Sequence, residues 1–122
     1  ATVFDAISAD AEYVGGAIAP GISVAADSLY HSTSQLRRVE LDRPSSAIGR
    51  NTVHAIQSGL VFGYTDMVKG MVARFDEELG GGCKVIATGG LSDLFAEEAG
   101  IFDVVLPNLT LSGLQIIHDL NT

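Results

Sequence analysis

Three adjacent polar residues, Arg50, Asn51 and Thr52, stand at the start of the longest amphipathic segment of the chain. A helix that begins here presents unpaired backbone N–H groups and a partial positive charge at its first turn, and anions bind readily at such ends. Arg50 adds a full positive charge, and the Thr52 hydroxyl can donate a directed hydrogen bond. The residues alone leave two interpretations open: a binding site for an anionic ligand, or an ordinary helix cap beside a solvated arginine.

Glycines mark two further places where a ligand could approach the backbone. In the segment 85–92, VIATGGLS, Gly89 and Gly90 separate an apolar strand from the start of a helix, which suits the sugar or base edge of a nucleotide. A structural tight turn explains this pattern at least as well. The segment 15–21, GGAIAPG, carries glycines at both ends, and its composition does not decide between ligand approach and chain reversal.

The other chemically capable residues are poorer candidates. His31, His54 and His118 lie far apart without carboxylates at metal-ligand spacing, so we interpret them as surface or helix-face histidines and expect no metal site. Cys83 follows three glycines and opens an apolar stretch, which favours a small buried side chain over a nucleophile. No paired carboxylates, Ser-His-Asp set or Walker-type loop is evident, so the segment offers no general base.

The composition limits the class of protein. With 47% apolar and 18% charged residues over 122 positions, the chain has the make-up of one globular domain. Fifteen acidic and seven basic residues give a formal net charge of −8, which argues against nucleic acid or an anionic membrane as the main partner because both require clustered Lys and Arg. No run of about 18 apolar residues is present, so we expect no membrane span. The single cysteine suits a reducing cytosol.

Hydrophobic periodicity predicts the elements that position these residues. The predicted strands are 2–8, 11–14, 17–19, 84–87 and 103–106, and the predicted helices are 22–31, 52–79, 92–99 and 109–120. Residues 32–48 lack a clear period and predict a surface connection with one possible short element at 38–41. In the long helix, Gly59 and Gly63 lie one turn apart, which is tolerable where another backbone packs closely or the helix bends. Strands followed by strand–helix alternation predict an α/β domain with one mixed sheet and helices on its faces.

The first residues already read as a strand in mid-course. Residues 1–7, ATVFDAI, alternate from the start and include no initiator methionine. Trimming of the N-terminus is the simplest explanation. We expect instead that the chain is the C-terminal half of a longer protein.

Five motifs together resemble one enzyme family in order and spacing. They are YVGGAIAPG at 13–21, AIGRNT at 47–52, AIQSGLVFGY at 55–64, VIATGGL at 85–91 and LTLSGL at 109–114. This set is similar to the type III pantothenate kinases, bacterial enzymes that open coenzyme A synthesis. The resemblance covers nearly the whole chain. It implies a homodimer of the sugar kinase, Hsp70 and actin superfamily, in which residues 1–122 form the second ribonuclease H-like (actin-like ATPase) domain.

The resemblance also assigns roles to particular residues. It implies that Thr52, with Arg50 and Asn51 beside it, binds pantothenate in a pocket that the neighbouring subunit completes. Gly89 and Gly90 become walls of the ATP cleft, and Thr2, in the tail of the family's strand hairpin, becomes a nucleotide contact. Val3 departs from the threonine that is common in that hairpin. The family's phosphate loop, its catalytic Asp and the Asp that holds a monovalent cation would all precede residue 1, so no catalytic residue is expected in this chain.

The implied reaction is transfer of the ATP γ-phosphoryl group to the 4′-hydroxyl of pantothenate. It would take place in the cytoplasm, with Mg²⁺ and a monovalent cation, K⁺ or NH₄⁺, and the isolated chain would be inactive. Two alternatives stay open. One is a non-enzymatic interaction protein, since members of this family have also been described as accessory transcription factors. The other is a related sugar or acetate kinase domain, which AIGRNT and LTLSGL fit less well.

Overall fold

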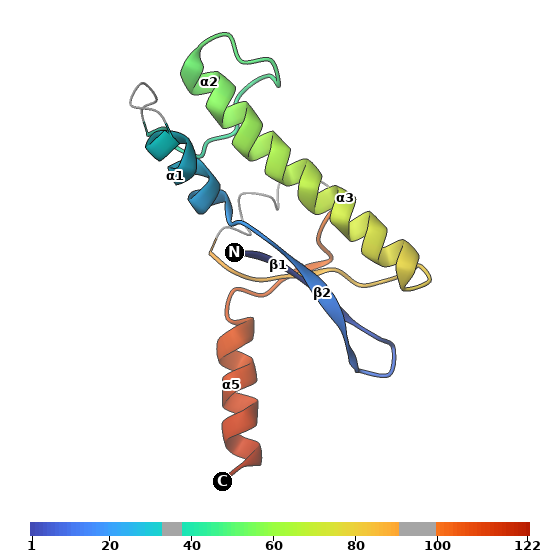
Figure 1. The fold of residues 1–122 in the computed structure, drawn as a ribbon. Helices are drawn as coiled ribbons and strands as arrows, with labels where there is room; N and C mark the ends of the chain where they lie inside the picture. Colours follow the sequence, from blue (N-terminus) through green and yellow to red (C-terminus); the bar gives the residue numbers. More distant parts are fainter. Residues whose placement is uncertain (33–37, 91–99) are drawn as a thin grey trace. The chain divides into compact units, whose positions relative to one another are not determined.

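The computed structural model describes residues 1–32, 38–90 and 100–122, which form two compact units. The first unit is Ala1–Leu79 and the second is Gly80–Thr122. Figure 1 shows helices combined with short strands, so the predicted α/β class is confirmed. The described residues contain no helix that is both long and apolar enough to cross a membrane.

The first unit opens with an antiparallel hairpin of β1 (Thr2–Ile7) and β2 (Tyr13–Ala19). The prediction of two separate strands at 11–14 and 17–19 was wrong, because β2 runs unbroken through the glycine pair. Gly15 adopts a φ of +141°, and the register passes over Val14 between the pairs Ala6–Gly15 and Ile7–Tyr13. The glycines therefore permit a bulge within one strand, where we had expected a break between two.

The predicted long helix is present from Thr52 to Glu78, in three continuous parts. These are α2 (Thr52–Gln57), a π-helical turn η1 (Ser58–Phe62) and α3 (Gly63–Glu78). The helix ends at three successive glycines with positive φ, Gly80 to Gly82, as their conformational freedom predicts. Gly59 lies in the π-helical turn and Gly63 directly after it, and an added Cβ at either would meet no atom of a described residue within 4 Å.

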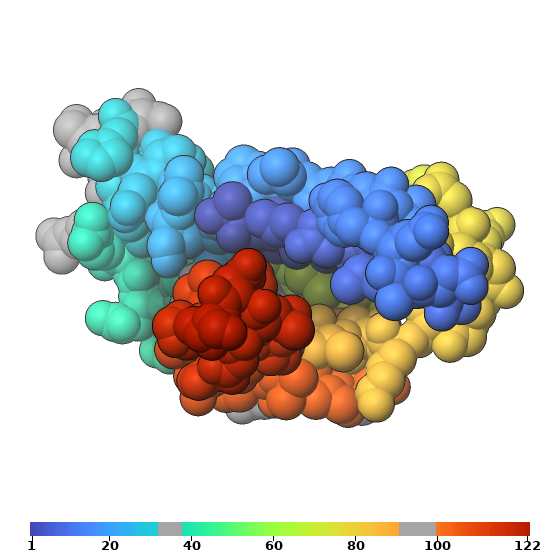
Figure 2. Space-filling view, turned by 90° about the horizontal axis from the view of Figure 1, so that it is seen from below, coloured from blue at the N-terminus to red at the C-terminus, as the bar shows by residue number. Residues whose placement is uncertain are grey.

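The core of the first unit forms where the long helix meets α1 (Ile22–Ser32) and the hairpin. Its buried apolar residues are Ile22, Ala26, Ile56, Leu60, Val61 and Val68. On the hairpin, Phe4 faces the helix, and its ring lies 6.1 Å from that of Phe75. A tilted aromatic pair of this kind contributes about 0.5–1.5 kcal/mol beyond area burial. The blue hairpin strands and the yellow end of α3 border each other in Figure 2 as well.

The second unit contains β3 (Ile86–Ala87), β4 (Val104–Val105) and α5 (Leu109–Leu120). The two strands pair in parallel, as expected for a strand–crossover–strand unit, but each is shorter than predicted. The Asp103 carboxylate accepts a hydrogen bond from the Val85 backbone N–H at 2.6 Å, just before β3. The predicted helix 92–99 lies outside the described residues.

The described strands form two two-stranded sheets, β1–β2 and β3–β4, each within one compact unit. The single mixed sheet expected from the sequence would join strands of both units, and it stays a prediction. The possible short element at 38–41 was wrong, because these residues form neither helix nor strand. Their backbone bonds instead to the side chains of Tyr30 and Gln57 on neighbouring helices.

Candidate functional site

The N-terminal end of α2 is built around Asn51. Its backbone is extended (φ −145°, ψ 170°), and its side-chain Oδ1 accepts a hydrogen bond from the His54 backbone N–H at 2.9 Å. The Asn51 Nδ2 also lies 3.3 Å from Nδ1 of His54. Asn51 is thus a helix cap, the structural alternative that the sequence left open for this position.

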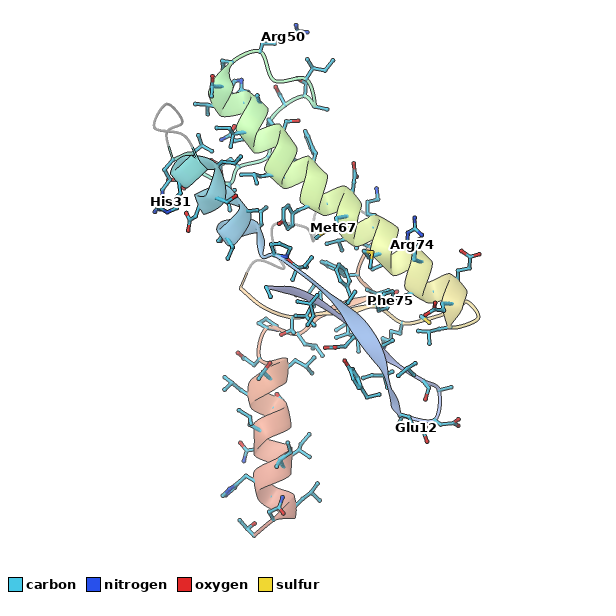
Figure 3. The ribbon with its side chains drawn as sticks, viewed as in Figure 1. Glu12, His31, Arg50, Met67, Arg74 and Phe75 are labelled. Carbon is cyan, nitrogen blue, oxygen red and sulfur yellow. The ribbon has the colours of Figure 1, made fainter. Side chains whose placement is uncertain are left out.

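Arg50 and Thr52, on either side of the cap, are exposed. Figure 3 shows the Arg50 side chain extending away from the end of α2. This places a guanidinium, a hydroxyl and the positive end of a helix within three consecutive residues. The arrangement can bind a carboxylate together with a neighbouring hydroxyl group.

Thr52 also lines an open groove between α1 and the start of the long helix. The groove has a volume of about 560 Å³ and is mostly apolar. Its lining residues are Ala25, Ser28, Leu29, Thr52, Ala55, Ile56, Gly59 and Leu60. We call residues Arg50 to Thr52 the helix tip. A ligand held by Thr52 has space for a short aliphatic chain in the groove beside this tip.

Residues 38–50, the connection that leads to the helix tip, are fixed to α1 and to the long helix. The Tyr30 hydroxyl accepts a hydrogen bond from the Val39 backbone N–H at 2.8 Å, and Arg38 pairs with Asp27 at 3.2 Å. Further along the connection, the Arg43 guanidinium lies over the Phe62 ring, 5.4 Å from its centre. The segment before Asn51 is thus anchored at several points along its length.

Gly49, part of the AIGRNT motif, has a structural role that the sequence did not show. A Cβ at this residue would lie 2.3 Å from the Ala55 backbone nitrogen and 2.5 Å from its Cα, well inside van der Waals contact. Only glycine lets the chain pass this close to the first turn of α2. The available signal was a glycine two residues before the cap.

Thr2 lies near the turn between β2 and α1, beside the middle of the long helix. Its hydroxyl donates to the Pro20 carbonyl at 3.3 Å, and the Tyr64 hydroxyl donates to the same carbonyl at 3.0 Å. On the same hairpin, Tyr13 donates a hydrogen bond to the Asp5 carboxylate at 3.1 Å, which raises the pKa of Tyr13. Thr2 and Thr52 are therefore at different places in this unit.

The glycine turn after β3 belongs to the second unit. Gly89 has a φ of +106°, a conformation that side chains rarely adopt, and both Gly89 and Gly90 are exposed. A glycine pair places no side chain between the backbone of this turn and an approaching nucleotide. This turn and the Asn51 cap thus belong to different compact units.

The remaining polar candidates form no catalytic cluster within the described ranges. His31 and His118 lie in the last turns of α1 and α5, and His54 belongs to the Asn51 cap. Cys83 is half-buried. Among residues 1–32, 38–90 and 100–122, no group of three or more His, Cys, Asp or Glu side chains is placed to hold a metal ion.

A family model and the curated relatives of this chain carry the same family name. A family model described as type III pantothenate kinase matches residues 1–74. Three curated relatives bear the same name. They come from Roseiflexus sp. (strain RS-1), 52% identical over 99% of this chain and 48% of the relative; Myxococcus xanthus, 51% over 99% and 47%; and Moorella thermoacetica, 49% over 100% and 48%. The chain thus spans about half the length of the curated relatives it matches.

A solved structure supports the fold separately. A Campylobacter jejuni protein described as a Baf family transcriptional activator superposes with a TM-score of 0.70, covering 98% of this chain and 53% of that chain. The two sequences are 22% identical. At that level the likeness establishes the fold alone.

Proposed function

Because the chain belongs to the type III pantothenate kinase family, we propose that it forms the C-terminal, ribonuclease H-like half of a two-domain kinase. The complete protein transfers the γ-phosphoryl group of ATP to the 4′-hydroxyl of pantothenate, in the cytoplasm. The observation that carries this proposal is the family match through residues 1–74, a range that includes the capped helix tip with its exposed Arg50 and Thr52.

In this proposal the helix tip binds pantothenate. The Thr52 hydroxyl hydrogen-bonds to the substrate, and the Arg50 guanidinium and the helix end attract its carboxylate. Asn51 holds the tip in place through its bond to the His54 N–H. Pantothenate carries both a carboxylate and hydroxyl groups, so its chemistry matches what this end of α2 offers.

Phosphoryl transfer itself depends mainly on positioning and charge neutralisation. The 4′-hydroxyl oxygen of pantothenate forms a bond to the γ-phosphorus, the bond from that phosphorus to the ADP oxygen breaks, and a carboxylate accepts the hydroxyl proton. We assign that carboxylate to the N-terminal half of the complete protein. The present chain contributes substrate binding and one wall of the nucleotide site.

The nucleotide contacts proposed here are Gly89, Gly90 and Thr2. The positive φ of Gly89 and the exposure of Gly89 and Gly90 suit a backbone surface against which adenosine packs. Mg²⁺ would neutralise charge on the phosphates, and K⁺ or NH₄⁺ would support nucleotide binding. The family resemblance places the Asp that holds the monovalent cation in the N-terminal half, so we assign that ion there and Mg²⁺ to the phosphates.

We expect Thr52→Val to raise the KM for pantothenate about two- to tenfold, because one hydrogen bond contributes roughly 0.5–1.5 kcal/mol. Valine keeps the shape of threonine and removes only the hydroxyl. Steady-state kinetics on the complete protein measure the effect, with the KM for ATP as internal control. An unchanged pantothenate KM would show that Thr52 is only part of the cap.

We also propose that the complete protein is a homodimer and that the long helix packs against its symmetry mate at Gly59 and Gly63. Both glycines are exposed, and no described residue has an atom within 4 Å of a Cβ added at either position. Backbones can approach closely where side chains are absent.

The dimer proposal predicts that Gly63→Leu shifts the complete protein from dimer to monomer at micromolar concentration. The leucine side chain would occupy the space that the second backbone needs. Light scattering measures the mass of the wild-type protein and of the variant under the same conditions. A wild-type protein that is already monomeric at high micromolar concentration would end this proposal.

The experiment for the activity itself is a coupled kinase assay on the complete protein. We expect ADP release that depends on pantothenate, ATP and Mg²⁺ with K⁺ or NH₄⁺ present. No turnover under these conditions would refute the proposed function.

A further inference from the structure

We infer that Ser58 is a positioning residue for pantothenate binding, acting through the backbone that leads to Arg50 and Thr52. This inference rests on the proposed function of the helix tip. It adds a residue six positions along the helix whose side chain does not belong to the tip itself.

The geometry starts from a buried hydroxyl. Ser58 is only 9% exposed, and its Oγ–H donates a hydrogen bond to the Ala47 carbonyl, eleven residues earlier in the sequence. The neighbouring Gln57 Nε2 donates to the Glu40 carbonyl at 3.0 Å. Two successive side chains of the helix thus hold the incoming connection at two points.

These bonds control the tip because the chain between them is short. Only residues 48–50 separate the Ala47 carbonyl from the Asn51 cap, and Asn51 is itself bonded to His54. Gly49 lies against Ala55 within this span. The segment is therefore held to one helix at both ends and in its middle, so releasing Ala47 frees Arg50 and the approach to Thr52.

A second buried hydroxyl in the same helix provides the comparison. Thr65 is 2% exposed, and its Oγ1 donates to the Val61 carbonyl of its own helix at 2.7 Å. That bond satisfies a polar group without reaching the connection. Ser58 bonds to a carbonyl outside the helix, which a merely self-satisfied core hydroxyl does not require.

The test compares Ser58→Ala with Thr65→Val in the complete protein. We expect Ser58→Ala to raise the pantothenate KM about two- to tenfold, the effect of one lost hydrogen bond, and to leave kcat and the KM for ATP unchanged. Thr65→Val should leave all three constants unchanged. Hydrogen exchange of a peptide spanning residues 44–53 should be faster in Ser58→Ala and unaltered in Thr65→Val.

The outcomes separate this inference from the proposed function. If the wild-type protein phosphorylates pantothenate but Ser58→Ala matches Thr65→Val in both KM and exchange, the inference is wrong and the function stands. If the wild-type protein does not phosphorylate pantothenate, the proposed function fails, and the exchange data alone then decide whether Ser58 orders the segment. Should Ser58→Ala fail to fold, Gln57→Ala removes the adjacent bond and must show faster exchange over residues 38–50, or the inference is overturned.

Discussion

Replacing Gly49 with alanine is expected to lower kcat/KM for pantothenate about 100-fold in the complete protein, the cost of a displacement of about 1 Å at a binding group. The new Cβ would lie 2.3 Å from the Ala55 nitrogen, so the backbone on either side must move. The nearest groups to move are Arg50 and the Asn51 cap. Steady-state kinetics with pantothenate as the varied substrate measure the loss.

Gly70→Ala is the matched control for this change. Gly70 lies inside α3 and is exposed, and an added Cβ there meets no atom within 4 Å in the part of the chain that the structure describes. Alanine at such a site stabilises a helix by about 0.4–1 kcal/mol and should leave kcat/KM unaltered. Equal kinetics for the two variants would show that the close approach at residue 49 has no part in substrate binding.

The second large effect concerns stability. Gly16→Ala should lower the free energy of unfolding by about 1–3 kcal/mol, the usual cost of overpacking. A Cβ at Gly16 would lie 2.1 Å from the Phe4 carbonyl oxygen, on the strand opposite. That contact is with backbone, which cannot rotate away as a flexible side chain does.

Urea unfolding of the complete protein measures this loss, again with Gly70→Ala as the control. The pantothenate KM of Gly16→Ala should stay close to that of the wild type, because Gly16 lies in the hairpin and not at the N-terminal end of α2. A Gly16→Ala protein as stable as the wild type would show that the hairpin relaxes at this point without cost.

The parts of the fold that sequence predicted well are those set by local periodicity. The long helix from Thr52 and the helix Leu109–Leu120 both have apolar residues in phase, and both are present with nearly the predicted bounds. Asn51 follows the preference of its residue type for the cap position. Such features depend on neighbours three or four residues away, which a single sequence displays directly.

The errors arose where distant contacts decide. The glycine pair in β2 looked like a break, but it allows the Phe4 strand to approach closely. Strand pairing also depends on which segments meet in space. The alternation of apolar and polar residues along a strand does not show which other strand it pairs with. The π-helical turn at Ser58–Phe62 has the same apolar spacing as the α-helix around it and left no separate signal.

In the candidate site, too, the sequence identified some residues and not others. The sequence identified the tip, because charge, hydroxyl and helix start are consecutive in it. It did not identify Ser58 or Gly49 as supports, because the bond to Ala47 and the contact with Ala55 exist only after the connection has folded back onto the helix. A serine within an amphipathic helix and a glycine in a loop are each too common to indicate such a role.

The most direct test is a crystal structure of the complete protein with pantothenate bound. We predict that the Thr52 hydroxyl lies within about 3.2 Å of a pantothenate oxygen, a hydrogen-bond distance, with the substrate at the N-terminal end of α2. Pantothenate bound elsewhere, with solvent alone around Thr52 and Arg50, would contradict the account.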